Sequence, residues 1–471
     1  MGKAGSLPSL FDILGPVMTG PSSSHTAGAV RIGRMGRSIL GEEPRDVTIT
    51  FHGALSGTYK GHFTDSGVVA GLLGMDVDDP RIPQALDLAR SGGMEVRVRA
   101  LPESQANPNT IDMELTGESD SVRVSAITVG GGEILVTRVG DAPVSLRGKS
   151  GVTLQEGVKS PRFLPPLYDY SLVNPEPLFD SFSGLADFAA TLGNSVPEAV
   201  LAWELHRSGL DAGQVRQRLS KIWQVMTRSV EKGLSGRNNL VGGFMPGDDA
   251  LKLWNAVLEG RAVSGDIPAK AVARSLAAME VNGSLGCVVA APTAGSCGVV
   301  PGALMTVAEA RGLTEPQVID GLLAATVTGV LIAAEAPISG ALGGCQSEVG
   351  VASAMAAAGL VQLGGGSPEA VCHGAALALK SLLGLICDPV GGPVEIPCIK
   401  RNAVGVANAL AAADMALAGI RSMIPPDEVV TALRNVQGLL PTELRGTMRG
   451  GLGVTETAAR LKEEWLRRIR S

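Results

Sequence analysis

Aromatic side chains and net positive charge are both scarce in this sequence. Phe, Trp and Tyr make up 3% of the 471 residues, and the net charge is −6 with a pI near 5.6. Nucleic-acid-binding proteins need a basic surface, and single-strand binders add aromatic stacking platforms. We therefore expect no nucleic-acid partner. The apolar residues are mainly small, and 62 glycines accompany them, which predicts closely packed helices.

Long apolar runs are also missing. The most apolar stretch, 322–334, is shorter than the ~20 residues that cross a bilayer. It predicts a buried helix, and we expect no membrane partner. The first 15 residues lack the apolar core of a secretory signal, and their Met-Gly-x-x-x-Ser pattern is too short to indicate myristoylation. We expect a cytoplasmic protein.

Cysteine is absent from the first half of the chain and never occurs as a C-x-x-C pair. This excludes the ligand runs of ferredoxins and zinc knuckles. It also excludes the disulfide framework of a small secreted domain. The six cysteines all lie in the second half: Cys287, Cys297, Cys345, Cys372, Cys387 and Cys398.

The patterning predicts an α+β protein with two unequal parts. Period-2 alternation between residues 45 and 139 predicts strands, so we assign an α/β domain to 1–160. Clustered prolines predict a linker over 161–182. The remainder, 183–471, has almost no alternation and predicts an all-helical domain. Its helix starts are marked by capping residues: Ser195, Thr314 and Ser367.

Two turns combine glycine with small hydroxyl side chains. The first, "GPSSSHTAGAV" (20–30), either caps the following helix or binds a small anion. The second, "APTAGSCGVVPG" (291–302), can expose several N–H groups to a carboxylate or phosphate, and it lacks the nucleotide P-loop pattern. Of five histidines, His25 and His62 lie in such Gly/Ser/Thr-rich loops. A lone histidine is more often structural, so a structural role and a functional role both stay open for each of them.

Three cysteines, Cys345, Cys387 and Cys398, are flanked by glycine or proline, which leaves room for an inorganic core. Three thiolates at long spacing could hold a [4Fe–4S] cluster with one iron open as a Lewis acid. The alternative for each is a buried structural cysteine. Cys372 lies in an apolar helical stretch and is assigned to the core. A nucleophilic role for Cys287 or Cys297 has no evident base nearby in sequence.

These stretches together resemble the iron–sulfur-dependent L-serine dehydratases (L-serine ammonia-lyases). "GPSSSHTAGAVRIGRMGRS" and "GTYKGHFTD" resemble the β part of that enzyme. "APTAGSCGVVPG", "ISGALGGCQSEVGVASAMAAAGL" and "LLGLICDPVGGPVEIPCIKRNAVGVANALAAADMALAGI" resemble its α part. The similarity covers nearly the whole chain, with both parts fused across the proline-rich segment.

The resemblance implies conversion of L-serine to pyruvate and ammonia. It implies that Cys345, Cys387 and Cys398 ligate a [4Fe–4S] cluster, without pyridoxal phosphate, and that the open iron coordinates the serine hydroxyl. We expect His62, or His25 in its place, to remove the Cα proton. The expected hydroxyl contacts to the substrate are Ser22, Ser23, Ser24, Thr26, Thr293 and Ser296. We expect Lys400 and Arg401 to supply positive charge either to the substrate carboxylate or to the cluster.

One departure from the family concerns its C-terminus. Some members end in a cysteine that occupies the open iron, whereas this chain has none after Cys398 and has Ala458 about where it would fall. We therefore expect water there. The rival functions are a pyridoxal-phosphate dehydratase, a relative acting on threonine or a cysteine derivative, and a non-catalytic iron–sulfur sensor. A homodimer is expected because closed dimers are the commonest assembly.

Overall fold

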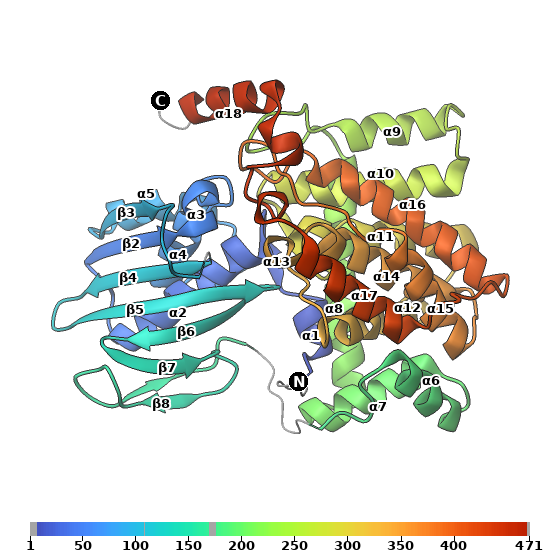
Figure 1. The fold of residues 1–471 in the computed structure, drawn as a ribbon, viewed down its shortest axis with the longest axis horizontal. Helices are drawn as coiled ribbons and strands as arrows, with labels where there is room; N and C mark the ends of the chain where they lie inside the picture. The colour runs from blue at the N-terminus through green and yellow to red at the C-terminus, as the bar shows by residue number, and fades with distance from the viewer. Residues whose placement is uncertain (1–6, 108, 169–175, 469–471) are drawn as a thin grey trace.

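The chain forms a sheet-containing part followed by a larger helical body (Figure 1). The computed structural model describes residues 7–107, 109–168 and 176–468. A six-stranded sheet occupies the first part, and long helices dominate the second. The predicted α+β class is confirmed.

The sheet has the strand order β3-β2-β4-β5-β6-β7, with β2 and β3 parallel and the other pairs antiparallel. Parallel neighbours need a crossover, and here helices α3, α4 and α5 lie between them in the chain. All five strands expected from alternation are present. The strands are β2 (Asp46–His52), β3 (Glu95–Leu101), β4 (Thr110–Thr116), β5 (Ser121–Gly130), β6 (Glu133–Val139) and β7 (Ala142–Leu146).

Two helices cover the buried face of this sheet and also contact each other closely. They are α2 (Gly28–Leu40) and α4 (Thr64–Leu72). Glycines face each other at the crossing: a methyl group on Gly71 would lie 2.9 Å from the Cα of Gly33. This backbone approach places the N-terminal ends of the two helices, and the loops before them, side by side. The smaller helices of this part are α3 (Gly53–Thr58) and α5 (Ala85–Ser91).

The expected linker is partly ordered as a strand. Within 161–182, β9 (Arg162–Leu164) pairs antiparallel with β8 (Val152–Leu154). The prolines at 161 and 165 flank this strand rather than interrupt it, so the ladder keeps its donors. Residues 169–175 of the predicted linker lie outside the described residues.

The helical body is built around two helices that are buried nearly all round, α12 and α14. Ser195 and Ser367 accept the expected cap bonds, and Thr314 forms a capping box with Gln317. The helices are α6 (Phe182–Thr191), α7 (Val196–Ser208), α8 (Ala212–Leu234), α9 (Asp249–Leu258), α10 (Asp266–Gly283), α11 (Val299–Arg311), α12 (Glu315–Ala333), α13 (Gly340–Gly343), α14 (Val351–Leu363), α15 (Pro368–Lys380), α16 (Cys398–Leu417), α17 (Pro426–Leu439) and α18 (Glu456–Arg468).

Helix α12 contains the predicted buried run. By length and composition alone it is the one helix of the described residues that could cross a membrane. Because 78% of its most apolar window is buried inside the molecule, it has the environment of a soluble protein's core helix.

The first residues of the chain belong to the helical body, although the sequence assigned them to the α/β domain. Helix α1 (Leu10–Ile13) packs in the helical core. Strand β1 (Val17–Thr19) pairs antiparallel with β10 (Cys287–Val289), so the second part is not wholly helical. Buried Glu204 accepts hydrogen bonds from Ser9 Oγ (2.9 Å) and from the N–H of Leu10 (3.2 Å). Three-residue strands are too short to show a period, which is why the sequence did not reveal them.

Candidate active site

Three cysteines meet where the helical body faces the sheet-containing part. Cys345 precedes the π-helical turn η4 (Gln346–Gly350), which leads directly into α14. Cys387 lies in the loop after α15, where its N–H donates to Leu444 O (2.8 Å). Cys398 is the first residue of α16. All three are free thiols.

The thiols lie close enough to interact. The ligand atoms of Cys345, Cys387 and Glu348 all lie within 4.8 Å of one another. A hydrogen bond to Cys345 raises the pKa of the Cys387 thiol, with burial adding to the effect. Burial raises the pKa of Cys398, and the charges of Cys345 and Glu348 raise it further. Buried thiols of this kind resist ionisation, so they would become thiolates only beside a cation.

Arg401 provides positive charge behind the thiols. Its Nη1 donates to Cys345 Sγ (3.5 Å) and to Ile386 O (2.8 Å). Its Nη2 lies 2.7 Å from Oδ1 of buried Asp388. Of the two predicted roles of Arg401, beside the cluster or beside the substrate, its contacts therefore favour the one beside the thiols.

A pair of histidines from the sheet-containing part faces the thiols. His25 lies in the π-helical turn η1 (Ser23–Ala27) before α2, and His62 lies in the loop before α4. Their Nδ1 atoms are 2.7 Å apart, and their rings stack with centroids 4.8 Å apart. Thr26 Oγ1 donates to His62 O (2.6 Å) and fixes the two loops relative to each other.

Both imidazoles are held in the neutral form. Burial lowers the pKa of His25 to about 4, against a smaller raising effect of the Asn109 side chain. Burial also lowers the pKa of His62 well below its usual value, and the charge of His25 lowers it further. A neutral imidazole is the form that accepts a proton.

The hydroxyl turn divides into residues that line the site and residues that build it. Ser22, Ser23 and Ser24 line the cavity beside His25 and His62. Ser22 Oγ also caps η1 by accepting from the N–H of His25 (3.1 Å). The capping interpretation of this turn is therefore confirmed by Ser22, whereas anion binding stays a prediction. Thr26 is buried and holds the His62 loop, so the structure places it as a support rather than a substrate contact.

Three further predicted substrate contacts do not reach the cavity. Ser296 Oγ donates to Ala291 O (3.1 Å) and lies 3.2 Å from Thr293 Oγ1, so Ser296 shapes its own turn. Thr293 donates to Glu348 in the cavity wall without lining the cavity itself. Lys400 is exposed and forms an ion pair with Asp249 on α9. The prediction for Lys400 is corrected on this ground. On helix α16, residue 400 faces away from the side where its neighbour Arg401 meets Cys345.

The cavity between the two parts is small, about 80 Å³. Pockets for drug-sized ligands measure roughly 300–1,000 Å³, so this one suits a small metabolite. Thiols, imidazoles and hydroxyls share its wall, together with the backbone of small residues. The lining residues include Ser22, Ser23, Ser24, His25, Thr58, His62, Gly295, Ser339, Gly340, Glu348, Cys387, Cys398, Arg445 and Gly446.

Several of these residues were not found from the sequence. Glu348 follows Cys345 by three residues, and burial raises its carboxyl pKa to about 6, against the hydrogen bonds from Thr293 and Gly340. Arg445 and Gly446 come from the loop after α17, which bridges to Cys387. A C-x-x-E spacing was the available signal for Glu348. Ala458, the position compared with the family's terminal cysteine, is buried in α18 and does not line the cavity.

The donor set fits an iron–sulfur cluster. Thiolates are the usual ligands of such clusters. Here three free thiols converge, with Arg401 available to balance their charge. Glycines leave space beside them, since a methyl group on Gly340 or Gly446 would lie 3.5 Å from Cys387 Sγ. The other predictions for cysteine agree: Cys372 is buried in the helical core and donates to Phe182 O (3.5 Å).

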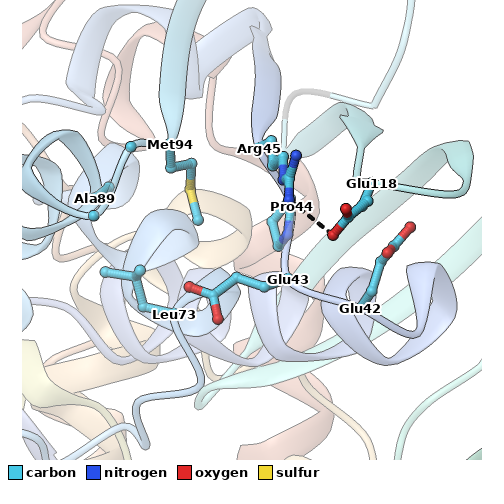
Figure 2. Close-up of a pocket in the computed structure, with 10 residues that line it drawn as sticks. Glu42, Glu43, Pro44, Arg45, Leu73, Ala89, Met94 and Glu118 are labelled. Carbon is cyan, nitrogen blue, oxygen red and sulfur yellow. Dashed lines mark hydrogen bonds and ion pairs between the residues drawn. The ribbon is translucent and has the colours of Figure 1, made fainter.

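A different hollow on the sheet-containing part has no such chemistry (Figure 2). Its volume is about 280 Å³, and its polar residues are mainly glutamates at the surface. Arg45 Nη2 pairs with Glu118 (2.8 Å), as the dashed line shows. Glu42 accepts from the N–H groups of Ser119 and Asp120. These groups satisfy one another and leave no candidate nucleophile or base.

Comparison with known proteins places this chain in a family. Residues 9–137 match the model "Serine dehydratase beta chain", and residues 187–453 match "Serine dehydratase alpha chain". The chain is 44% identical over 269 residues to "Probable L-serine dehydratase, alpha chain" of Bacillus subtilis, covering 57% of this chain and 89% of that protein.

Two relatives match along almost their whole length. The chain is 33% identical over 476 residues to "L-serine dehydratase TdcG" of Escherichia coli. It is also 33% identical over 467 residues to "L-serine dehydratase" of Streptomyces coelicolor. Each alignment covers 95% of this chain and 98% of the relative. The chain therefore belongs to the serine dehydratase family, in the form that joins the β and α chains in one polypeptide.

Proposed function

We propose that this protein converts L-serine to pyruvate and ammonia, with a [4Fe–4S] cluster held by Cys345, Cys387 and Cys398. The observation that carries the proposal is the shared cavity. Imidazoles from the β-like part and thiols from the α-like part line one small space, in a chain of the serine dehydratase family. When bound, such a cluster supplies a Lewis acid that weakens the bond between a substrate carbon and its hydroxyl.

The residues of the chain provide the proton transfer. His62 takes the Cα proton of serine at Nε2. This requires the tautomer of His62 that carries its own proton on Nδ1, where it is donated to His25 Nδ1. Nε2 of His62 then has a free lone pair. The 2.7 Å separation requires one proton between the two Nδ1 atoms. The double bond between Cα and Cβ forms as the Cβ–O bond breaks. The hydroxyl leaves as water with the proton that His62 took from Cα, which returns His62 to its neutral form. The resulting aminoacrylate tautomerises and is hydrolysed to pyruvate and ammonia.

The hydroxyl turn serves to bind and orient the substrate. Ser22, Ser23 and Ser24 line the cavity, and the proposal assigns them to the substrate carboxylate. Ser23 Oγ also accepts from the N–H of Ala294 (3.3 Å), which joins the turn to the helical body. A second link is the hydrogen bond from Asn282 Nδ2 to Pro21 O (2.9 Å). These hydrogen bonds fix the position of the hydroxyls relative to the thiols across the boundary between the two parts.

The setting of the enzyme is part of the same proposal. We propose a cytoplasmic homodimer that degrades free L-serine and has no membrane or nucleic-acid partner. Sedimentation of the purified protein tests the dimer.

The decisive experiment is anaerobic purification followed by addition of L-serine. The expected result is a brown protein with about four irons per chain that forms pyruvate and loses colour and activity together in air. The variant His62→Ala should keep the iron content and lose at least about 100-fold in kcat, since a general base contributes roughly that much or more. The variant Lys400→Ala, outside the cavity, is the matched control and should turn over normally.

Other outcomes decide between the alternatives. A colourless active protein with a pyridoxal absorption band would keep the reaction and reject the cluster. A brown protein inert towards serine but active on threonine or a cysteine derivative would change the substrate. A brown protein inert towards all of them would support a sensor.

A further inference from the structure

Glu348 supplies a carboxylate to the candidate active site, between the thiols and the imidazoles. It lies in η4, and its side chain lines the cavity with His25 and His62. The surrounding backbone leaves room for it. A methyl group on Gly340 would clash with Glu348 Oε2, and one on Gly295 would lie 3.3 Å from Oε1. The cavity is therefore shaped around this carboxylate.

The carboxylate has hydrogen bonds but lacks a cationic partner in the protein. Thr293 and the backbone of Gly340 donate to it. Within the described ranges, none of the ion pairs involves Glu348. Arg401, which contacts Cys345 Sγ, is already paired with Asp388 at 2.7 Å. A partly buried carboxylate without a cation is costly, so the site is prepared for a cation from outside the chain.

The other charged group in the cavity wall is committed elsewhere. Arg445 donates from Nε to Leu440 O (2.9 Å) and from Nη2 to Gln437 O (2.9 Å), at the end of α17. It thereby caps that helix rather than neutralising Glu348. The cavity thus presents one carboxylate whose charge Arg445 does not neutralise, which suits the ammonium group of a zwitterion.

We propose that Glu348 is the residue that binds the α-ammonium group of the substrate. This inference rests on the proposed function. It makes Glu348 the residue by which the site prefers an amino acid to a hydroxy acid with the same carbon skeleton. An ammonium group offers three N–H donors and a full positive charge, and hydrogen bonds between charged groups are about twice as strong as neutral ones. Serine held in this way keeps its Cα and its hydroxyl in the cavity that His62 and the thiols share.

The test compares two ligands that differ only in the amine. L-Serine and 3-hydroxypropanoate have the same carboxylate and hydroxyl. Both are titrated calorimetrically and anaerobically into wild type, Glu348→Gln and the matched control Glu335→Gln, which lies outside the cavity. Iron content and the cluster absorption are recorded for each protein, and KM and kcat are measured for serine.

The expected result is selective. Glu348→Gln keeps its iron and its absorption, binds serine about 10- to 100-fold more weakly, and binds 3-hydroxypropanoate as tightly as wild type or more tightly. The loss should appear mainly in KM. Glu335→Gln should match wild type with both ligands. Should Glu348→Gln fail to fold, Glu348→Asp, which keeps the charge, should retain the preference for serine.

Two results would overturn the inference. An equal loss of affinity for both ligands would show that Glu348 shapes the cavity without binding the amine. Loss of iron or a changed cluster absorption in Glu348→Gln would make Glu348 part of the metal site. Failure of the proposed function is a separate observation, because a wild-type protein that binds serine in preference to 3-hydroxypropanoate without forming pyruvate would leave the role of Glu348 intact.

Discussion

His25 and His62 face each other with their Nδ1 atoms 2.7 Å apart, although each belongs to a different loop. The cause lies in the helices that follow them. α2 and α4 cross with Gly33 against Gly71, and this contact brings the two preceding loops together. The pair is thus a product of helix packing, and it joins two histidines that sequence reasoning treated as alternatives for one role.

The pair leads to a prediction about pH dependence. Burial lowers the pKa of His62, and the charge of His25 lowers it further, so His25→Asn should raise this pKa in part. The acidic limb of the plot of kcat/KM against pH should then move to higher pH, because His62 must be neutral to accept a proton. Steady-state rates between pH 5 and 8 measure this shift. An unchanged acidic limb in the variant would show that the two rings do not titrate together.

Folding stability should depend on pH through the same residue. Burial lowers the pKa of His25 from 6.5 to about 4, so between these values the unfolded chain binds more protons than the folded one. The free energy of unfolding should therefore fall as the pH drops from 7 towards 4, by up to about 3 kcal/mol from this residue. Urea denaturation of wild type and His25→Gln at pH 7 and pH 5 measures the difference, and the variant should lose less. Equal losses would contradict the prediction.

The loop that carries His62 depends on a glycine contact with the helical body. A methyl group on Gly61 would lie 2.5 Å from the carbonyl carbon of Gly392 and 2.8 Å from its oxygen, in the segment between Cys387 and Cys398. Gly61→Ala must therefore displace His62 from the thiols, and we expect kcat to fall at least about 10-fold, since small displacements of catalytic groups are expensive.

The matched control for this variant is Gly57→Ala, in helix α3, four residues before Gly61. A methyl group at Gly57 meets only Met448 Cε, at 3.7 Å, and α3 tolerates alanine. It should keep wild-type rates. If both variants lose activity equally, the contact between Gly61 and Gly392 is not what positions His62.

Patterns in the sequence predicted the parts of the fold that have a regular period. Alternation revealed strands β2 to β6, and capping residues such as Ser367 marked helix starts. Strands β9 and β10 each have three residues, too few to show a period. The π-helical turns before α2 and α14 have no propensity signal of their own, yet they carry His25 and Glu348.

The site was predicted unevenly for a physical reason. The cysteines were assigned through the family resemblance, because their spacing alone left a buried structural role open for each of them. Glu348 did not, since a single glutamate among small residues resembles an ordinary polar position. Lys400 and Arg401 are neighbours, but a helix directs adjacent side chains about 100° apart. Only the three-dimensional structure shows that Arg401 reaches Cys345 while Lys400 reaches Asp249.

That division between neighbours is itself testable. Arg401→Gln removes a cation that contacts Cys345 Sγ and pairs with Asp388. The variant should lose iron faster than wild type when a chelator is added, because the thiolates lose their compensating charge. Lys400→Gln removes a surface ion pair worth about 1 kcal/mol or less. Its iron loss should follow the wild-type rate, and equal acceleration in both variants would reject a specific role for Arg401.

The placement of α1 and β1 has a consequence for how the chain is made. A ribosome releases residues 10–19 first, but their partners, Glu204 and β10, are hundreds of residues further along. Contacts so distant in sequence form late and slowly. Residues 10–19 therefore stay unpaired until most of the helical body has been synthesised, and their packing is a late step of folding. Cutting the chain between the two parts would not separate them, because residues 10–19 are covalently joined to the sheet-containing part and pack in the helical body.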